Sequence, residues 1–357
     1  MRVLVIGSTG YLGRHVAGHL RAALPAARVL DAGRSPGAAV RIDLAHDRPD
    51  QVADTLAGVV PDAVVNCAGA TGGDAVTLAE TNARGPAVLC AALRRAAPGA
   101  RLVHLGSAAE YGPGDPGSRV TESAATRPVS PYGATKLAGT VAVTASGLDA
   151  VVLRIGNPVG AGAPPGGLPG RVATLLREAG RAPGAVLRLG DLSAHRDFVD
   201  ARDVARAVVL ATTADGPLPP VLNIGGGDAA PVRAMVRGLA RAAGFAGRIE
   251  EDAGEAAHSA RSREVSWQCS SIDEAARALG WRPRYSLDDA VAALWAATAQ
   301  RDAADTAGAA GRAADTAGGA DTAGGVADTA GGVADTAGAA PARPVEAGGV
   351  VAGGPLP

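Results

Sequence analysis

The chain has 357 residues and a formal net charge of −1, and charged side chains make up 19% of it. This balance excludes a global field that would attract nucleic acid or an anionic membrane, so any anion must be bound by local groups. Three widely spaced cysteines, Cys67, Cys90 and Cys269, argue against a zinc site or disulfide framework and favour a reducing compartment. No apolar run approaches the roughly 20 residues that cross a bilayer. We therefore expect a cytoplasmic protein without membrane, nucleic-acid or metal partners.

Residues 1–20, MRVLVIGSTGYLGRHVAGHL, predict a buried strand, a glycine turn and an amphipathic helix. Glycines spaced as GxxGxxG allow a sharp turn and let a pyrophosphate approach the helix N-terminus. Free N–H groups and the helix dipole favour negative charge there. We predict that a dinucleotide contacts Gly7, Thr9, Gly10, Tyr11, Leu12 and Gly13.

Further strand-like runs follow at 27–33, 63–70, 101–107 and 150–157, separated by helical segments rich in Ala, Leu and Arg. This alternation predicts an α/β fold of Rossmann type, a doubly wound parallel sheet with helices on both faces. Ligands of such sheets bind at the carboxyl ends of the strands. Four runs end in small or polar residues: Gly7, Ala68-Gly69-Ala70, Ser107 and Gly156-Asn157.

The second run bears on the choice between NAD and NADP, and it leaves two interpretations open. A carboxylate after this strand binds the adenosine ribose and repels a 2′-phosphate, whereas an arginine accommodates that phosphate. Counting without gaps from Gly7 puts Asp31 at the carboxylate position. A strand two residues longer puts Gly33 there, with Arg34 beside the phosphate site.

The stretch SPYGATK, 130–136, contains the only lysine of the chain, among 34 basic residues. Ser130 suits an N-cap and Pro131 the first helical position, so Tyr132 and Lys136 share one helix face. A phenol of pKa about 10 is a poor acid–base group at neutral pH, and a nearby positive charge lowers that pKa. Lysine supplies a compact charge that the wide fork of arginine cannot replace.

Ser107 ends the strand 101–107 that precedes this helix. Its hydroxyl can donate a hydrogen bond to a substrate carbonyl while Tyr132 delivers or removes the proton. We therefore predict a catalytic set of Ser107, Tyr132 and Lys136 that acts on a carbonyl group.

From about residue 300 an ADTAG unit repeats at uneven spacing, without aromatic or large aliphatic side chains. Such a segment buries too little apolar surface to offset its ordering entropy. We predict a disordered, low-complexity tail over 299–357 and a folded part over 1–298.

The glycine motif, Ser107 and Tyr132-x-x-x-Lys136 together resemble the short-chain dehydrogenase/reductase superfamily. The length and the motif GSAAEYG (106–112) resemble its extended branch, which acts on nucleotide sugars. The likeness is closest to GDP-4-keto-6-deoxy-D-mannose reductases and related NDP-4-ketohexose reductases. It covers residues 1–298 and includes segments 153–160, 189–207, 222–227 and 261–291.

The resemblance implies a dinucleotide-binding Rossmann domain over 1–158, to which 199–225 return. A smaller substrate lobe would comprise 159–198 and 226–298. It also implies a nucleotide-diphosphate sugar as substrate, and a homodimer formed through the helix carrying Tyr132 and its neighbour. The coenzyme is NADP(H) in the interpretation we favour, because net reduction fits these relatives, with NAD(H) as the alternative.

Carried over residue by residue, the resemblance makes Ser107, Tyr132 and Lys136 catalytic, with Lys136 also bonding the nicotinamide ribose. Asn82 matches a position that is mainly structural. Coenzyme contacts would further include Asp31 or Arg34, Asp43 and Leu44 at the adenine, and Ala68, Gly69, Ala70 and Gly156. The substrate would contact Ser107, and its diphosphate would be held by Asn157, Arg196 and Arg261.

The sequence also narrows the reaction. Dehydratases of this branch follow the active Ser or Thr with an Asp-Glu pair, where this chain has Ala108 and Ala109. Reductases that also epimerise carry a cysteine at the second of these positions. Three hypotheses stay open: a 4-keto-6-deoxy sugar nucleotide reductase, an NDP-sugar 4-epimerase with bound NAD, and a non-catalytic dinucleotide-sensing protein.

Overall fold

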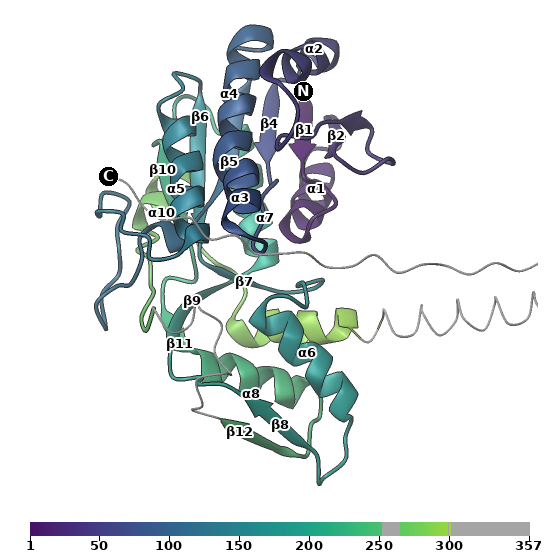
Figure 1. Ribbon diagram of the computed structural model, residues 1–357, viewed down its shortest axis with the longest axis vertical. Helices are drawn as coiled ribbons and strands as arrows, with labels where there is room; N and C mark the ends of the chain where they lie inside the picture. The colour runs from purple at the N-terminus through teal and green to yellow at the C-terminus, as the bar shows by residue number, and fades with distance from the viewer. Residues whose placement is uncertain (252–264, 299, 301–357) are drawn as a thin grey trace, which may run out of the picture. The chain divides into compact units, whose positions relative to one another are not determined.

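Seven parallel strands form the main sheet of the computed structural model, which describes residues 1–251, 265–298 and 300. Their order is β10-β6-β5-β4-β1-β2-β3 (Figure 1), so the chain reverses its direction of travel across the sheet between β1 and β4. Ligands of such sheets bind outside the carboxyl ends of the strands at this switch point. The strands are β1 (Arg2–Ile6), β2 (Arg28–Gly33), β3 (Val40–Arg41), β4 (Ala63–Asn66), β5 (Arg101–Ser107), β6 (Ala150–Ile155) and β10 (Val221–Ile224).

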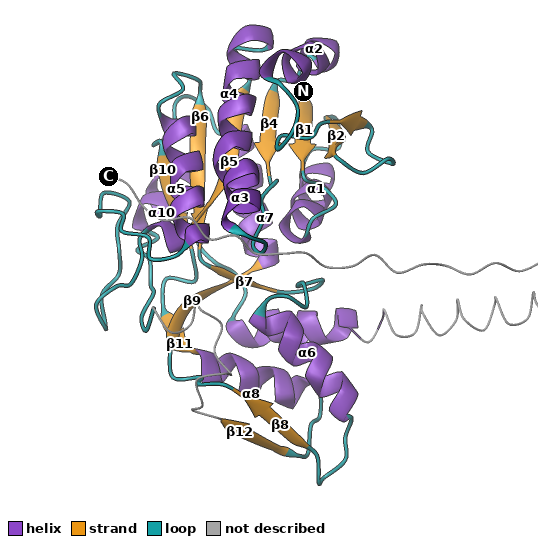
Figure 2. Ribbon diagram, in the orientation of Figure 1, coloured by secondary structure: helices purple, strands orange, loops and turns teal. Residues whose placement is uncertain are grey.

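Helices pack on both faces of this sheet, because its strands are apolar on both sides. Alternate residues of β1 enter different cores: Val3 and Val5 face one layer, and Leu4 and Ile6 face the other. Figure 2 shows α4 and α5 in front of the sheet, covering one of its faces. The predicted doubly wound parallel sheet is therefore confirmed. The first layer contains α1 (Tyr11–Ala23), α7 (Ala201–Thr213) and α10 (Asp273–Leu279), and the second α2 (Pro49–Val59), α4 (Gly85–Ala96) and α5 (Pro131–Thr144).

Short irregular turns lie at the carboxyl ends of the central strands. After β4, α3 (Ala75–Ala79) continues into a π-helical turn, η1 (Glu80–Arg84). After β5 comes a single 3₁₀ turn, η2 (Ala108–Glu110). π-helical turns occur frequently at functional sites, so η1 marks this edge of the sheet as a candidate site.

A separate hydrophobic core is enclosed by the remaining elements. Strands β7 (Asn157–Val159), β9 (His195–Asp200) and β11 (Ala229–Pro231) form a three-stranded sheet, and β8 (Val186–Leu189) pairs with β12 (Arg248–Glu251). Helices α6 (Leu168–Ala179) and α8 (Val232–Ala242) and the helical residues 287–298 cover this core. β10 belongs to the large sheet, although the strands of the two smaller sheets come both before it and after it in the sequence. The predicted domain boundaries stay a prediction.

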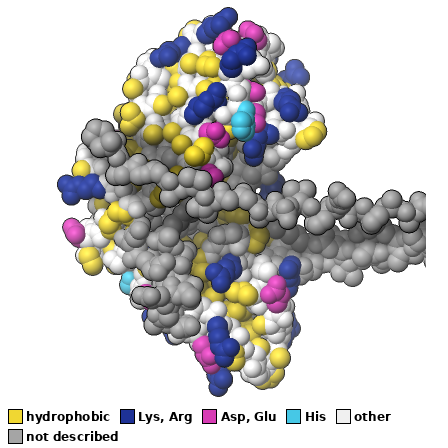
Figure 3. Space-filling model, in the orientation of Figure 1, with side chains coloured by type: hydrophobic (Ala, Val, Ile, Leu, Met, Phe, Trp, Pro, Cys, Tyr) yellow, Lys and Arg dark blue, Asp and Glu magenta, His cyan; other side chains and the backbone are white. Residues whose placement is uncertain are grey.

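Basic and acidic side chains are interspersed over the face seen in Figure 3. Within the described residues, no helix combines the length and apolar character needed to cross a membrane, and no three His, Cys, Asp or Glu side chains converge as a metal site. The predicted disordered tail and Arg261 lie outside the described residues.

Candidate functional site

The glycine turn between β1 and α1 is closed by backbone hydrogen bonds and leaves no room for side chains. Gly7 has φ +79°, in the left-handed region, and its N–H donates to the Ala32 carbonyl over 2.8 Å. A Cβ at Gly13 would lie 2.0 Å from the Gly7 oxygen. Gly10 caps α1 without a side-chain hydrogen bond. The N-terminus of α1 thus begins at a turn of glycine backbone and has no side-chain cap. Such a helix N-terminus suits the predicted pyrophosphate.

The segment after β4 lies directly beside this turn, since a Cβ at Gly7 would lie 2.7 Å from the Ala68 nitrogen. Asn82, in η1, holds the segment by two hydrogen bonds of 2.9 Å: it accepts from the Ala70 N–H and donates to the Ala70 carbonyl. Its amide also donates to Thr135 of α5 over 3.3 Å. Asn82 therefore positions the 68–70 backbone against the helix that carries Tyr132 and Lys136.

Lys136 completes a continuous row of contacts along the carboxyl edge of the sheet. A Cβ at Gly69 would lie 3.9 Å from the Lys136 Nζ. Lys136 is only 5% exposed, and its ammonium donates to the Leu105 carbonyl of β5. Half-buried Tyr132 lies one helical turn earlier on α5. The glycine turn and the Tyr-x-x-x-Lys helix are thus brought together.

Burial dominates the electrostatics around Lys136. It lowers the pKa of Lys136 to about 8, while Glu110 and Cys67 act in the opposite direction. His104, also fully buried, has a pKa well below its usual value because of burial and the nearby Lys136 charge. The His104 ring contacts the Asn66 amide at 3.2 Å. A charged side chain at this buried position is therefore unfavourable unless a hydrogen bond or an opposite charge compensates for the lost water.

Ser107 is 8% exposed at the end of β5. Its N–H donates to the Glu110 carboxylate over 2.7 Å, and its hydroxyl oxygen accepts from the Ala109 N–H over 3.2 Å. A Cβ at Gly133 would lie 2.5 Å from the Ala109 oxygen. The turn that follows Ser107 therefore packs tightly against the first turn of α5, one residue from Tyr132.

The end of β2 presents Gly33, not Asp31, to the glycine turn. Asp31 pairs with Val5 inside the sheet, and its carboxylate accepts a hydrogen bond of 2.5 Å from Arg21 of α1. β2 continues to Gly33, where a Cβ would lie 4.0 Å from the Gly7 nitrogen. Exposed Arg34 follows immediately.

Other predicted coenzyme residues have roles in the fold as well. The Asp43 carboxylate accepts from the Ala45 N–H over 3.1 Å and contacts His46 at 2.9 Å, and the Leu44 side chain is buried in the core. The buried Tyr11 hydroxyl has no hydrogen-bond partner among the residues that the structure describes, and burial raises its pKa. Two further residues predicted to contact the coenzyme make contacts within the fold. The Thr9 carbonyl accepts a hydrogen bond of 2.8 Å from Arg14, and the Leu12 side chain packs against the first hydrophobic core.

Of the predicted substrate residues, Asn157 follows the end of β6 and Arg196 lies near the start of β9. Half-buried Arg196 makes one hydrogen bond among the described residues, to the His195 carbonyl over 2.8 Å, and burial lowers its pKa. Asn157 donates to the Asp197 carbonyl (3.3 Å) and to Gln268 (2.9 Å), so its amide hydrogens are engaged. A Cβ at Gly156 would lie 2.7 Å from the Asp197 oxygen. Arg261 lies outside the described residues.

Sequence reasoning missed the buried acids that hold these segments. Asp197, fully buried, accepts from the N–H groups of Gly226, Gly227 and Ser270 at 2.6 to 3.1 Å, and burial raises its pKa to about 6. Glu110, also fully buried, pairs with Arg154. The motifs RDF, GSAAEYG and LRIGN contain these residues, but no local pattern reveals which distant groups they contact.

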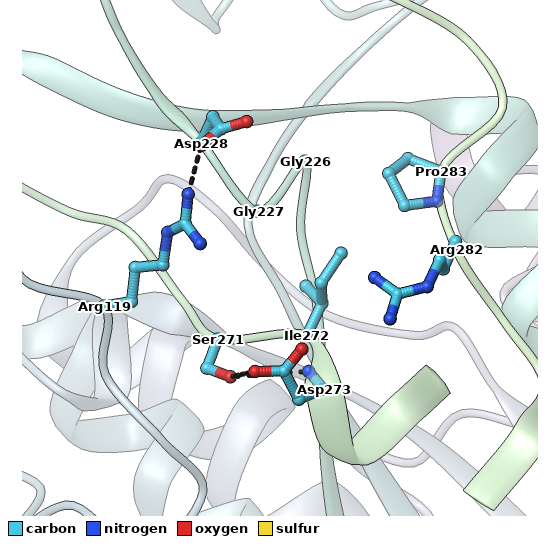
Figure 4. A pocket seen from close by; sticks show the side chains of 9 residues that line it. All are labelled: Arg119, Gly226, Gly227, Asp228, Ser271, Ile272, Asp273, Arg282 and Pro283. Atoms are coloured by element: carbon cyan, nitrogen blue, oxygen red, sulfur yellow. Dashed lines mark hydrogen bonds and ion pairs between the residues drawn. The ribbon is translucent and has the colours of Figure 1, made fainter. Parts of the chain in front are cut away.

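A cavity of about 260 Å³ lies beside the Gly226–Asp228 loop (Figure 4). Arg119 and Asp228 form an ion pair at its rim, and the Arg282 side chain points toward it. None of the three predicted catalytic side chains lines it. It is therefore separate from the glycine turn and the catalytic set.

Comparison with known proteins adds independent findings. A profile of the NAD dependent epimerase/dehydratase family matches residues 3–225. The chain is 39% identical to the dTDP-6-deoxy-L-talose 4-dehydrogenase (NAD(P)(+)) of Kitasatospora kifunensis over 83% of this chain and 95% of that protein. It is 30% identical to the UDP-glucose 4-epimerase of Azospirillum brasilense, over 81% and 89%. Among solved structures, RMD from Pseudomonas aeruginosa complexed with NADPH superposes with a TM-score of 0.69, at 25% identity, covering 84% and 99%.

The crowding at the glycine turn leads to a matched pair of substitutions within α1. In Gly13→Ala the new methyl would meet the Gly7 carbonyl at 2.0 Å, so the turn must shift. We expect NADPH affinity to fall at least tenfold by fluorescence titration, together with a lower melting temperature.

Gly18→Ala is the control, because nothing lies within 4 Å of its added Cβ. It should leave NADPH binding unchanged and stabilise the helix by up to about 1 kcal/mol. Equal NADPH affinity in the two variants would contradict the assignment of this turn.

Proposed function

The chain belongs to the NAD dependent epimerase/dehydratase family, an extended branch of the short-chain dehydrogenase/reductases, and we propose that it reduces the C4 carbonyl of a 4-keto-6-deoxy sugar nucleotide. One observation carries the proposal. The glycine turn at Gly7 approaches Ala68 closely, and Gly69 lies near the buried Lys136 ammonium, which supports a coenzyme bound beside Lys136 and Tyr132.

Each catalytic side chain has one task in this reduction. A bound nicotinamide coenzyme supplies the hydride that C4 receives. Tyr132 delivers the proton to the carbonyl oxygen, and Ser107 donates a hydrogen bond to that oxygen. The Lys136 ammonium stabilises the phenolate that Tyr132 leaves behind. Hydride and proton together convert the C4 carbonyl to a hydroxyl group.

The surroundings of Ser107 argue against dehydration, which needs a second acid–base pair near the same carbonyl. Ala108 and Ala109 follow Ser107. The carboxylate closest in sequence, Glu110, has both oxygens committed to the Ser107 N–H and to Arg154. We therefore assign it no proton transfer, and the proposed chemistry is confined to the C4 carbonyl.

The relative that is 39% identical supports the choice of substrate. Its name describes the oxidation of a 6-deoxy sugar at position 4 of a dTDP conjugate, which is the reverse of the proposed reduction. We therefore propose a dTDP-linked sugar, although the sequence resembles GDP-sugar reductases as well. Half-buried Arg196, with no carboxylate partner among the described residues, is our candidate for the diphosphate.

A 4-epimerase is the second candidate, because the UDP-glucose 4-epimerase relative is 30% identical over most of both chains. The two activities share Ser107, Tyr132 and Lys136. They differ in cofactor use, since an epimerase regenerates its bound NAD and a reductase consumes reduced coenzyme.

We propose NADPH as the coenzyme of the reduction. Asp31 lies two residues before the end of β2, and its partly exposed carboxylate forms an ion pair with Arg21 of α1. Gly33 and then Arg34 follow beside the glycine turn, and a guanidinium there favours a 2′-phosphate.

The reductase proposal is tested by offering NADPH with dTDP- and GDP-linked 4-keto-6-deoxyhexoses and following the loss of reduced coenzyme. We expect stoichiometric NADPH consumption. Tyr132→Phe should lower kcat by at least about a hundredfold, the usual contribution of general acid catalysis, while NADPH binding persists. Interconversion of C4 epimers of an NDP-sugar without net NADPH loss would favour the epimerase instead.

The proposal for NADPH gives a pair of substitutions on β2. Arg34→Ala should weaken NADPH binding about tenfold or more and leave NADH binding unchanged, because only the phosphate contact is lost. Asp31→Asn is the control and should not improve NADPH binding, since this carboxylate faces Arg21. A large gain in NADPH affinity from Asp31→Asn would show that Asp31 repels the phosphate.

The proposed homodimer is supported by an apolar outer face on α5, where Ala134, Ala138 and Val141 are exposed at helical spacing. Val141 is 55% exposed. We expect sedimentation to give a dimer and Val141→Arg to give a monomer. Val60→Arg, at a valine 60% exposed outside α4 and α5, should leave the dimer intact. A monomeric wild type would contradict this interface.

A further inference from the structure

Glu110 is a fully buried carboxylate at the end of η2 that the proposed reaction does not use. One of its oxygens accepts the Ser107 N–H over 2.7 Å, and the other accepts from the Arg154 Nε over 2.8 Å. A Cβ at Gly106 would lie 2.8 Å from the first oxygen. The carboxylate is therefore fitted closely against the end of the strand that presents Ser107.

Arg154 is anchored in turn by a network that crosses the sheet. Its guanidinium lies 4.5 Å over the centre of the Tyr111 ring, and the Tyr111 hydroxyl donates to Asn223 of β10 over 2.8 Å. The Asn223 N–H donates to Glu122 over 2.9 Å. A buried ion pair is weak evidence for stability, because desolvation offsets much of its attraction. Its location beside Ser107 points to a role in the site.

The second role of Glu110 follows from its position beside β5, because the Lys136 ammonium donates to the Leu105 carbonyl and the Glu110 carboxylate accepts the Ser107 N–H two residues further along that strand. Burial keeps His104 of β5 neutral, because it lowers the pKa of that ring well below its usual value. Burial also keeps the Cys67 thiol neutral, because it raises its pKa to about 12. Among the titratable groups shown to act on Lys136 within the described residues, Glu110 alone supplies a negative charge.

We propose that Glu110 is a positioning residue that serves two members of the catalytic set at once. One carboxylate oxygen fixes the Ser107 backbone at the strand end, and its negative charge stabilises the Lys136 ammonium, which is held at the Leu105 carbonyl two residues earlier on the same strand. Arg154 holds the carboxylate in place. The consequence for turnover depends on the proposed function, whereas the effect on Lys136 does not.

The single lysine makes the charge effect directly measurable. Full-length protein grown with lysine labelled with ¹³C at Cε gives one side-chain resonance, and its titration reports the pKa of Lys136. That pKa, about 8 because of burial, should fall by about one further unit in Glu110→Gln. The amide oxygen of glutamine can still accept the Ser107 N–H, but its NH2 group then faces the Arg154 Nε–H, so this variant removes the charge together with the Arg154 hydrogen bond.

Two further variants separate the charge from the integrity of the fold. Glu110→Gln with Arg154→Met removes both buried charges, which proteins often tolerate, and should also lower the pKa of Lys136. Arg154→Met alone keeps the carboxylate and should not lower it. An unchanged pKa in the double variant, or equal falls in all three variants, would overturn the proposal.

Turnover provides the second readout. In the NADPH-dependent reduction, the alkaline limb of kcat should move to lower pH in Glu110→Gln by the same interval as the lysine titration, without a matching change in KM. A lysine shift without any turnover would count against the proposed reaction but not against the role of Glu110. A kcat profile that stays in place while the lysine titration moves would refute the catalytic part.

Discussion

The Lys136 ammonium is held where burial opposes its charge, and much of the site is arranged around that conflict. Its hydrogen bond to the Leu105 carbonyl and the negative charge of Glu110 compensate for lost water. An ammonium so poorly solvated interacts strongly with any anion that develops nearby, because the local dielectric is low. In the proposed reaction, the burial that makes this charge costly to the fold would also strengthen its effect on the Tyr132 phenolate.

Sheet topology delivers the other groups to this point. β1, β4 and β5 are neighbours in the sheet, and all three run parallel, so Gly7, Ala68 and Ser107 lie along one edge. The helix α5 packs against that edge through close backbone contacts at Gly133 and Gly139, where a Cβ would lie 2.5 Å and 2.2 Å from neighbouring carbonyl oxygens. These two glycines thus allow α5 to approach the turns that surround it.

Buried acids perform similar structural work on the two sides of the site. Glu110 holds the turn after β5, and Asp197 gathers the Gly226 and Gly227 N–H groups and Ser270 beside Arg196. Each binds segments that are distant in sequence. A carboxylate can do this because it accepts several hydrogen bonds at once. The glycine turn, where we propose that the coenzyme binds, is built instead from bare backbone, which suits a bulky anionic ligand.

Local pattern alone determined the fold class, the glycine turn, the strand that ends in Ser107 and the helix that pairs Tyr132 with Lys136. These features depend on residues within one turn or one strand, where chain geometry is set by near neighbours. Only the tertiary structure decided that β2 extends to Gly33 and leaves Asp31 facing Arg21. It alone revealed that Asn157 is committed to Gln268, and that Glu110 joins Ser107 to Arg154. Such contacts depend on strand register and on which distant side chains share a buried space, and neither is written in a short stretch of sequence.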